Sequence, residues 1–134
     1  DAEDGKLETF DALYPRGNYF SDLAQLGPAN FVNVNPYLTL RPREDLVLSL
    51  DVNFYWRLEE EDGVYGPPGN LIRLPNGSDE RYVNTAVSMS VEWEINRHWM
   101  VAVSLAHSRP EAFIEDTGPS DRANFAEFTL EARL

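Results

Sequence analysis

The chain has 134 residues, a hydrophobic content of 43%, a charged content of 25% and a net charge of −12. This length suits one domain with one modest core, and the apolar content argues against disorder as the default state. The acidity argues against nucleic acid as a partner, because phosphate binding needs clustered lysine and arginine side chains, and the lack of cysteine excludes disulfides and thiolate metal sites.

No run of about eighteen apolar residues occurs, so the sequence predicts no transmembrane helix. A transmembrane strand leaves no such run, because only alternate residues face lipid. The mean hydropathy of −0.42 is therefore compatible with a membrane barrel.

Residues 1–30 show no sustained periodicity and are punctuated by Pro15, Gly17, Gly27 and Pro28. Aromatic side chains are interleaved with these turn residues. We expect a long ordered loop with aromatic anchors, and a short strand at 7–10.

Residues 31–57 predict two extended runs around a tight turn at 41–45, because apolar side chains recur at every second position. One face of this hairpin carries Val32, Val34, Pro36, Leu38, Leu40, Leu46, Leu48, Leu50, Val52, Phe54 and Trp56. The other face carries Phe31, Asn33, Asn35, Tyr37, Thr39, Val47, Ser49, Asp51, Asn53, Tyr55 and Arg57. Each run has about eleven residues, the length of a tilted strand that crosses a bilayer.

The same alternation recurs further along the chain. After a predicted loop at 58–81, residues 82–95 place Val83, Val87, Met89, Val91, Trp93 and Ile95 on one face. A tight turn at 96–98 leads to a run at 99–108, whose apolar face carries Trp99, Val101, Val103 and Leu105. A third loop at 109–123 precedes the last run, 124–134, in which Ala126, Phe128, Leu130, Ala132 and Leu134 alternate with Phe125, Glu127, Thr129, Glu131 and Arg133.

Long and tight connections alternate strictly, which is the layout of an outer-membrane barrel with short periplasmic turns and long outer loops. Aromatic side chains are expected at both ends of the apolar stripes, with Trp93 and Trp99 near a tight turn and Trp56, Tyr82 and Phe125 at the loop ends. The predicted fold is all-β, an antiparallel up-and-down meander of about five long strands within a transmembrane β-barrel. The alternative is a soluble sandwich or lipocalin-like barrel that buries the same stripes in a core.

We interpret residues 1–134 as a single β-barrel segment, with 1–30 as a long outer loop and 31–134 as the stranded part. Five strands are too few to close a barrel, and open sheet edges are not tolerated in lipid. The expected partners are therefore the lipid bilayer of the outer membrane and the remaining strands of a larger barrel, or another copy of the chain.

The polar face supplies the candidate binding residues. Amide, hydroxyl, guanidinium and carboxylate groups suit hydroxyl-rich solutes through hydrogen bonds and ring stacking. The residues expected to line the lumen are Asn33, Asn35, Tyr37, Asp51, Asn53, Tyr55, Arg57, Glu92, Glu127, Glu131 and Arg133. The alternative for each charged member is that Asp51, Arg57, Glu131 and Arg133 only pair with one another to satisfy a barrel interior.

No catalytic, metal or cofactor site is predicted. Asp116-Thr117-Gly118 has the tripeptide of aspartic proteases, but Pro119 and a polar loop follow it, so a turn is the better interpretation. The acidic run 59–62 is expected to be a solvated loop, with a calcium site as the alternative. His98 and His107 lack metal-ligand spacing.

Several short motifs resemble the bacterial alginate export family in their order and spacing. They are Thr9-Phe10-Asp11 with Leu13-Tyr14-Pro15, Leu26-Gly27-Pro28-Ala29-Asn30, Trp56-Arg57, Asp62 with Val64-Tyr65-Gly66, Tyr82-Val83, and Asn96-Arg97-His98. The resemblance covers the C-terminal part of the family's sequence. It implies an outer-membrane barrel of many more strands that exports or admits polysaccharide, with its chain end on the periplasmic side. The family's channel is lined by basic residues, whereas the inward charges here are mainly acidic.

We therefore expect a porin-like, non-enzymatic transport segment of the bacterial outer membrane for polysaccharide or related polar solutes. The competing function is a soluble all-β binding module whose aromatic-rich loops form the ligand mouth.

Overall fold

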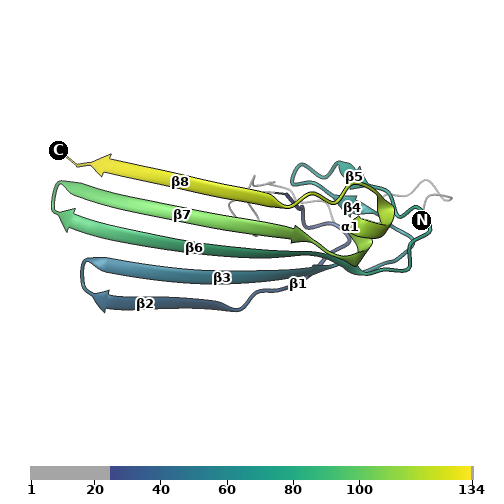
Figure 1. Ribbon diagram of the computed structural model, residues 1–134, viewed down its shortest axis with the longest axis horizontal. Coiled ribbons are helices and arrows are strands. Elements are labelled where there is room, and N and C mark those ends of the chain that lie inside the picture. Colours follow the sequence, from purple (N-terminus) through teal and green to yellow (C-terminus); the bar gives the residue numbers. More distant parts are fainter. Residues whose placement is uncertain (1–24, 134) are drawn as a thin grey trace.

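The computed structural model describes residues 25–133, and Figure 1 shows one long antiparallel sheet with a small layer of loops at one end. The elements are β1 (Val32–Val34), β2 (Tyr37–Arg43), β3 (Leu46–Trp56), β4 (Val64–Tyr65), β5 (Leu71–Arg73), β6 (Tyr82–Asn96), β7 (Trp99–Pro110), α1 (Ala112–Thr117) and β8 (Ala123–Ala132). The main sheet has the order β1-β3-β6-β7-β8, with β2 also paired to β3. The predicted all-β meander is confirmed, and the sheet is open rather than closed. Within residues 25–133, no helix is long and apolar enough to span a bilayer.

β1 and β2 are two parts of one extended run beside β3. Val34 pairs with Phe54 and Tyr37 pairs with Asp51, so the register continues unchanged through Asn35 and Pro36. Proline lacks the N–H that would bond to β3. The side-chain amide of Asn35 donates instead to the carbonyl of Val52 at 3.0 Å, while the Val52 N–H donates to the Pro36 carbonyl at 3.0 Å. The side chain of Asn35 thus replaces the bond that the proline cannot make.

The register gathers the predicted stripes on two faces of the sheet. Residues that lie directly opposite each other on antiparallel strands share a face. Leu50 pairs with Met89, which pairs with Leu105, whereas the adjacent row joins Ser49, Ser90 and Ser104. We call these surfaces the apolar face and the polar face.

The apolar face is open across the whole sheet. Its large side chains in the middle of the strands are exposed, with Leu50 at 41% and Phe128 at 67% of their full area. The exposed hydrophobic residues of this face are Val32, Val34, Leu38, Leu40, Leu50, Val87, Met89, Val91, Trp93, Ile95, Trp99, Val103, Leu105, Phe128 and Leu130. A monomeric water-soluble domain rarely leaves such a continuous apolar surface uncovered.

Aromatic side chains lie at both ends of the apolar face. Trp56 stacks on Tyr82 at the loop end, with ring centroids 5.2 Å apart. At the opposite end, the indole N–H of Trp93 donates to Asp45 in the β2–β3 turn at 3.1 Å. The expectation that Phe125 belongs to this set was wrong, because its register partner Ala106 lies on the polar face beside Ser88.

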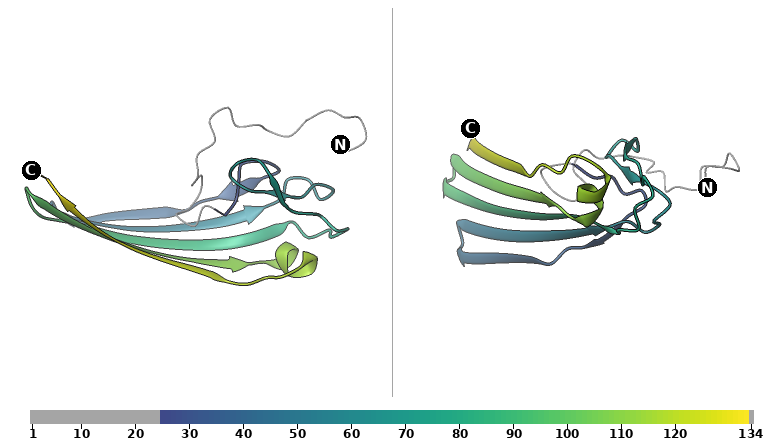
Figure 2. Two further views of the ribbon diagram at one scale, coloured as in Figure 1. Left: turned by 90° about the horizontal axis from the view of Figure 1, so that it is seen from above. Right: turned by 45° about the vertical axis from the view of Figure 1, so that its right-hand side comes forward.

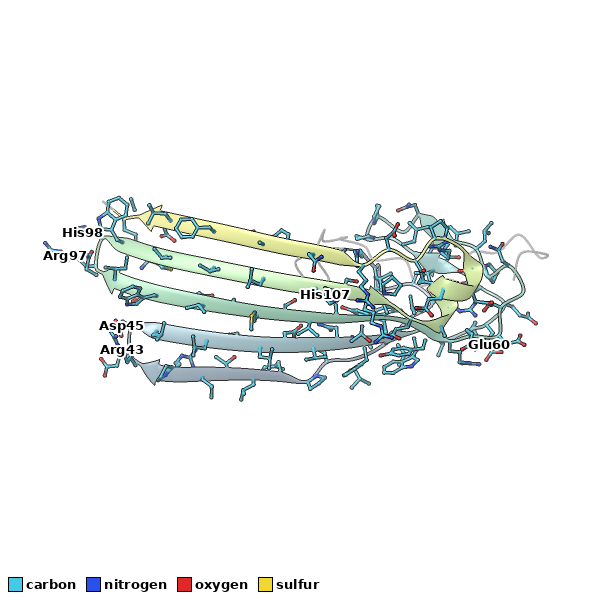
Figure 3. All side chains as sticks on the ribbon, viewed as in Figure 1. Arg43, Asp45, Glu60, Arg97, His98 and His107 are labelled. Atoms are coloured by element: carbon cyan, nitrogen blue, oxygen red, sulfur yellow. The ribbon has the colours of Figure 1, made fainter. Side chains whose placement is uncertain are left out.

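The connections follow the predicted alternation. The β2–β3 and β6–β7 turns lie at one end of the sheet, and β8 also ends there (Figure 1). Figure 3 shows Arg43, Asp45, Arg97 and His98 together at this end, far from Glu60 among the loops. The short connections and the long ones therefore occupy opposite ends of the strands.

The loops form a layer on the polar face at their end of the sheet (Figure 2). We define this loop layer as residues 25–31, 58–81 and 111–122. Its core consists of buried residues from the layer and from the sheet beneath it: Leu26, Tyr55, Val64, Val83, Ala86 and Phe113. The predicted loop 1–30 lies outside the described residues except for 25–30.

Three features of this layer differ from the sequence predictions. The segment 58–81 contains the β4–β5 hairpin, and 109–123 contains α1 after β7 has continued to Pro110. Val83 does not lie in the apolar stripe, because the register shifts between Tyr55 and Trp56 against β6. Such a bulge places two residues opposite one and redirects a side chain, and here it turns Val83 into the buried core.

Candidate functional site

A row of amide and carboxylate side chains on the polar face comes from β1, from the link between β1 and β2, and from β3. Asn35 donates to Asp51 Oδ2 at 2.6 Å, and Asn53 donates to the other oxygen of the same carboxylate. Asn33 donates to Asn53 Oδ1 at 3.0 Å. The structure thus brings four of the predicted lumen residues into one hydrogen-bonded row.

The two tyrosines predicted for this surface have opposite environments. Tyr37 is 77% exposed, and its register partner is Asp51. Tyr55 is 2% exposed, and its ring centroid lies 5.2 Å from that of Phe31 in the loop layer. Tyr37 presents a ring to solvent, whereas Tyr55 and the 1%-exposed Asn53 lie where the layer covers the sheet.

Two further acidic members of the predicted set, Glu92 and Glu127, lie on the polar face outside the area that the loop layer covers. Glu92 pairs in register with Val47 and Ala102, and Glu127 accepts a hydrogen bond from Thr129 at 3.0 Å. Both are exposed side chains on the polar face. This part of the surface therefore carries negative charge that faces solvent.

Glu131 and Arg133 form the ion pair that the sequence analysis gave as an alternative to solute binding. Arg133 Nε lies 2.8 Å from Glu131, and its Nη1 lies 3.3 Å from Glu94. The hydrogen bond that Arg133 donates to Glu131, followed by the charge of Glu131, raises the pKa of Arg133 above its ordinary value. The positive charge of Arg133 is thus shared between two carboxylates.

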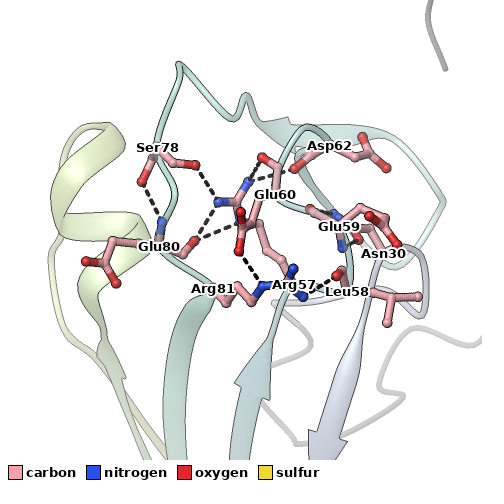
Figure 4. Close-up of polar contacts among 9 residues, drawn as sticks. All are labelled: Asn30, Arg57, Leu58, Glu59, Glu60, Asp62, Ser78, Glu80 and Arg81. Carbon is pink, nitrogen blue, oxygen red and sulfur yellow. Dashed lines mark hydrogen bonds and ion pairs between the residues drawn. The ribbon is translucent and has the colours of Figure 1, made fainter.

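Arg57 differs most from its predicted position, because it lies beneath the loop layer rather than along an open wall. Its side chain is 1% exposed, and its donors reach only backbone carbonyls in the described contacts (Figure 4). It makes no pair with Asp51, Glu131 or Arg133 among the ion pairs of the described residues. Burial lowers the pKa of its guanidinium from the ordinary value of that group.

Asn30 joins two segments of the loop layer, and the sequence patterns did not mark it individually. Its side chain accepts from the Glu59 N–H at 2.7 Å and donates to the carbonyls of Glu59 and Gly63 at 3.0 and 2.9 Å. Its φ of 49° is in the left-handed region that asparagine tolerates better than most residues. The signal was its place in the Leu26–Asn30 motif.

Gly27 in the same motif allows two backbone segments to approach closely. Its N–H donates to the Tyr65 carbonyl at 2.8 Å, and a Cβ at this position would collide with the Gly66 carbonyl. The segment before β1 is therefore attached directly to the β4–β5 hairpin. Glycine is required here by contact, not by an unusual φ.

The sequence profile of the family described as "Alginate export" matches residues 1–127. The chain belongs to the alginate export family. No curated protein and no solved structure matched it. In this family member, the motif residues 26–30 and 62–66 meet in the loop layer.

The acidic run of this alginate export family member is engaged in protein contacts. Glu60 accepts from Arg81 at 2.5 Å, and Asp62 accepts from the Tyr65 hydroxyl at 2.9 Å and from the Gly63 N–H at 2.7 Å. Within residues 25–133, no three histidine, cysteine or acidic side chains come together as a metal site.

The remaining motifs have structural contacts. Asp116 and Thr117 end α1, and the Thr117 hydroxyl donates to the Phe113 carbonyl at 2.7 Å. His107 Nδ1 lies 2.8 Å from Asn124 Oδ1 across β7 and β8. His98 Nδ1 lies 3.0 Å from the Arg133 carbonyl. Each of these side chains therefore has a structural contact at the end of a helix, between two strands or at a turn.

Proposed function

We propose that this chain forms part of the wall of an outer-membrane β-barrel channel that conducts polysaccharide or related polar solutes. One observation carries the proposal: the register puts the large aliphatic side chains of the long strands on one exposed face and hydrogen-bonding side chains on the other. A bilayer covers the first kind of surface and a water-filled lumen suits the second. Membership of the alginate export family supports the same role.

The two unpaired edges of the sheet are completed by further strands. β8 bonds to β7 alone, and β2 bonds to β3 alone, among the described residues. Free backbone N–H and C=O groups cannot remain unpaired in hydrocarbon. The partners are the remaining strands of a larger barrel or another copy of the chain.

The solutes are neutral or cationic rather than polyanionic. The open polar face carries the carboxylates of Asp51, Glu92 and Glu127. Two basic side chains were expected to balance this charge, but both have other partners. Arg57 is buried and donates to backbone carbonyls, and Arg133 pairs with Glu131 and Glu94. An acidic wall repels anions and attracts cations. Asn35 and the exposed ring of Tyr37 supply the hydrogen bonds and stacking surface that hydroxyl-rich solutes use.

The loop layer narrows the channel at one end. It covers Asn53, Tyr55 and Ser108 of the polar face, each with at most 2% of its area exposed. The loops therefore fold inward over the wall instead of standing away from it, and the free width of the lumen is smaller at this end than at the tight-turn end.

The competing function, a soluble binding module, would bury the apolar stripes in a dry core. The same stripes are exposed across the described sheet. Purification of the full-length protein distinguishes the two: a requirement for detergent and ion conductance in planar bilayers are expected. A folded monomer in plain buffer that gives no conductance would overturn the channel proposal.

A further inference from the structure

The buried side chain of Arg57 contacts the loop layer from the side that faces the sheet. All five N–H donors of Arg57 are used: Nε donates to Glu80 O at 3.0 Å, Nη1 to Glu60 O and Asp62 O at 2.6 and 2.8 Å, and Nη2 to Ser78 O and Glu80 O at 2.8 and 2.5 Å. A buried charge is costly unless polar groups surround it. Here the backbone of the loop provides that surrounding (Figure 4).

The acceptors come from both ends of the long loop. Glu60 and Asp62 follow β3 closely, whereas Ser78 and Glu80 precede β6. The loop between them carries the β4–β5 hairpin. Because one side chain bonds to both ends, it fixes the direction in which the whole loop leaves the sheet.

The flat face of the same guanidinium rests on the helix of the second loop. The Arg57 carbon atom Cζ lies 4.0 Å from the centre of the Phe113 ring, and Phe113 is fully buried. Stacking of a guanidinium on an aromatic face is favourable and directional. Arg57 therefore joins α1 to the loop 58–81, and both lie over the polar face.

We propose that Arg57 is the positioning residue that fixes the loop layer over the polar face and so sets the width of the channel at its loop end. The inference rests on the channel function proposed above. Lysine cannot replace Arg57, because an ammonium has three donors and no planar face for Phe113. Removing the side chain leaves the four carbonyls of residues 60, 62, 78 and 80 unsatisfied, which favours outward movement of the loops.

The test compares single-channel conductance and the exclusion limit for neutral polymers of graded size in the full-length protein. Arg57→Met and Arg57→Lys are expected to raise the conductance and to shift the exclusion limit to larger polymers. Arg97→Met is the matched control, because Arg97 lies in the turn at the opposite end and contacts His98. Assembled Arg57→Met channels with wild-type conductance and exclusion limit would overturn the inference. A wild-type protein without conductance would instead overturn the channel function.

A crosslink provides a second arm, whose first measurement keeps Arg57 unchanged. Asn76 Nδ2 donates to the Thr117 carbonyl at 3.3 Å, so these positions of the two loops are in contact, and the chain has no cysteine of its own. A short thiol crosslinker between Asn76→Cys and Thr117→Cys should leave wild-type conductance unchanged, because the loops are already held, and should restore wild-type conductance to Arg57→Lys. A crosslink that lowers the wild-type conductance would show that the layer moves without it, which contradicts a fixed constriction.

Discussion

An arginine in place of Leu50 tests whether the apolar face contacts lipid. Leu50 lies near the middle of β3, between Leu48 and Val52 on the same face, and 41% of its area is open. A charged side chain at the bilayer midplane on the lipid face of a barrel costs about 2–4 kcal/mol. Leu50→Arg should therefore shift the folding equilibrium roughly 30- to 700-fold toward the unfolded state, at about 1.4 kcal/mol for each tenfold change.

The matched control is Ser90→Arg at nearly the same depth on the opposite face. Ser90 pairs with Ser49 and Ser104, and its neighbour Met89 pairs with Leu50. An arginine here meets water and the carboxylate-bearing wall, so we expect a change well below that of Leu50→Arg. Folding of the full-length protein into lipid vesicles, measured by urea titration, compares the two variants. Equal stability losses, or a larger loss for Ser90→Arg, would refute the assignment of the faces.

Three further predictions concern the wall, the loop layer and the tight-turn end. Asp51→Asn should reduce the preference for cations over anions, read as a change in reversal potential under a salt gradient; an unchanged potential would remove this carboxylate from the selectivity of the wall. Asn30→Gly keeps the backbone conformation accessible but loses three side-chain hydrogen bonds, so the free energy of unfolding should fall by about 1–3 kcal/mol, and equal stability in urea titration would contradict this role. The hydrogen bond from Arg43, followed in effect by that from Trp93, lowers the pKa of Asp45 below its ordinary 3.8. The stability that ionised Asp45 adds to the folded state is present above pH 3.8 and is lost as the pH falls through the lower folded pKa. The Trp93 emission should therefore change only below pH 3.8. An Asp45→Asn variant with the same transition would refute the assignment of this transition to Asp45.

The strands could be predicted because their physical cause is local. Alternation of side chains across a strand needs no knowledge of neighbours, and a stripe such as Leu46, Leu48 and Leu50 is visible in the sequence alone. The register could not be read from the tight turns at 44–45 and 97–98 alone, because each hairpin shifts by one residue beside its turn, between Leu40 and Arg43 and between Glu94 and Asn96.

The loop layer could not be predicted in the same way, because its contacts join distant segments. The partners of Arg57 are backbone carbonyls, which every residue possesses and no sequence pattern marks. The polar stripe made Arg57 a candidate for an open wall, and only the fold shows that loops cover it. Val83 was misplaced for a similar reason, because one extra residue in β6 changes the face of a side chain without changing the composition of the strand.

The position of Pro36 affects whether another strand can pair with the outer edge of β2. Proline in a border strand often blocks association, because it removes a donor from the outer side. Here its carbonyl bonds to Val52, so the missing donor faces β3 and Asn35 compensates for it. Since adjacent residues of an antiparallel strand direct their backbone groups to opposite sides, Tyr37 and Thr39 offer intact N–H and C=O groups outward. The outer edge of β2 can therefore form backbone hydrogen bonds with another strand.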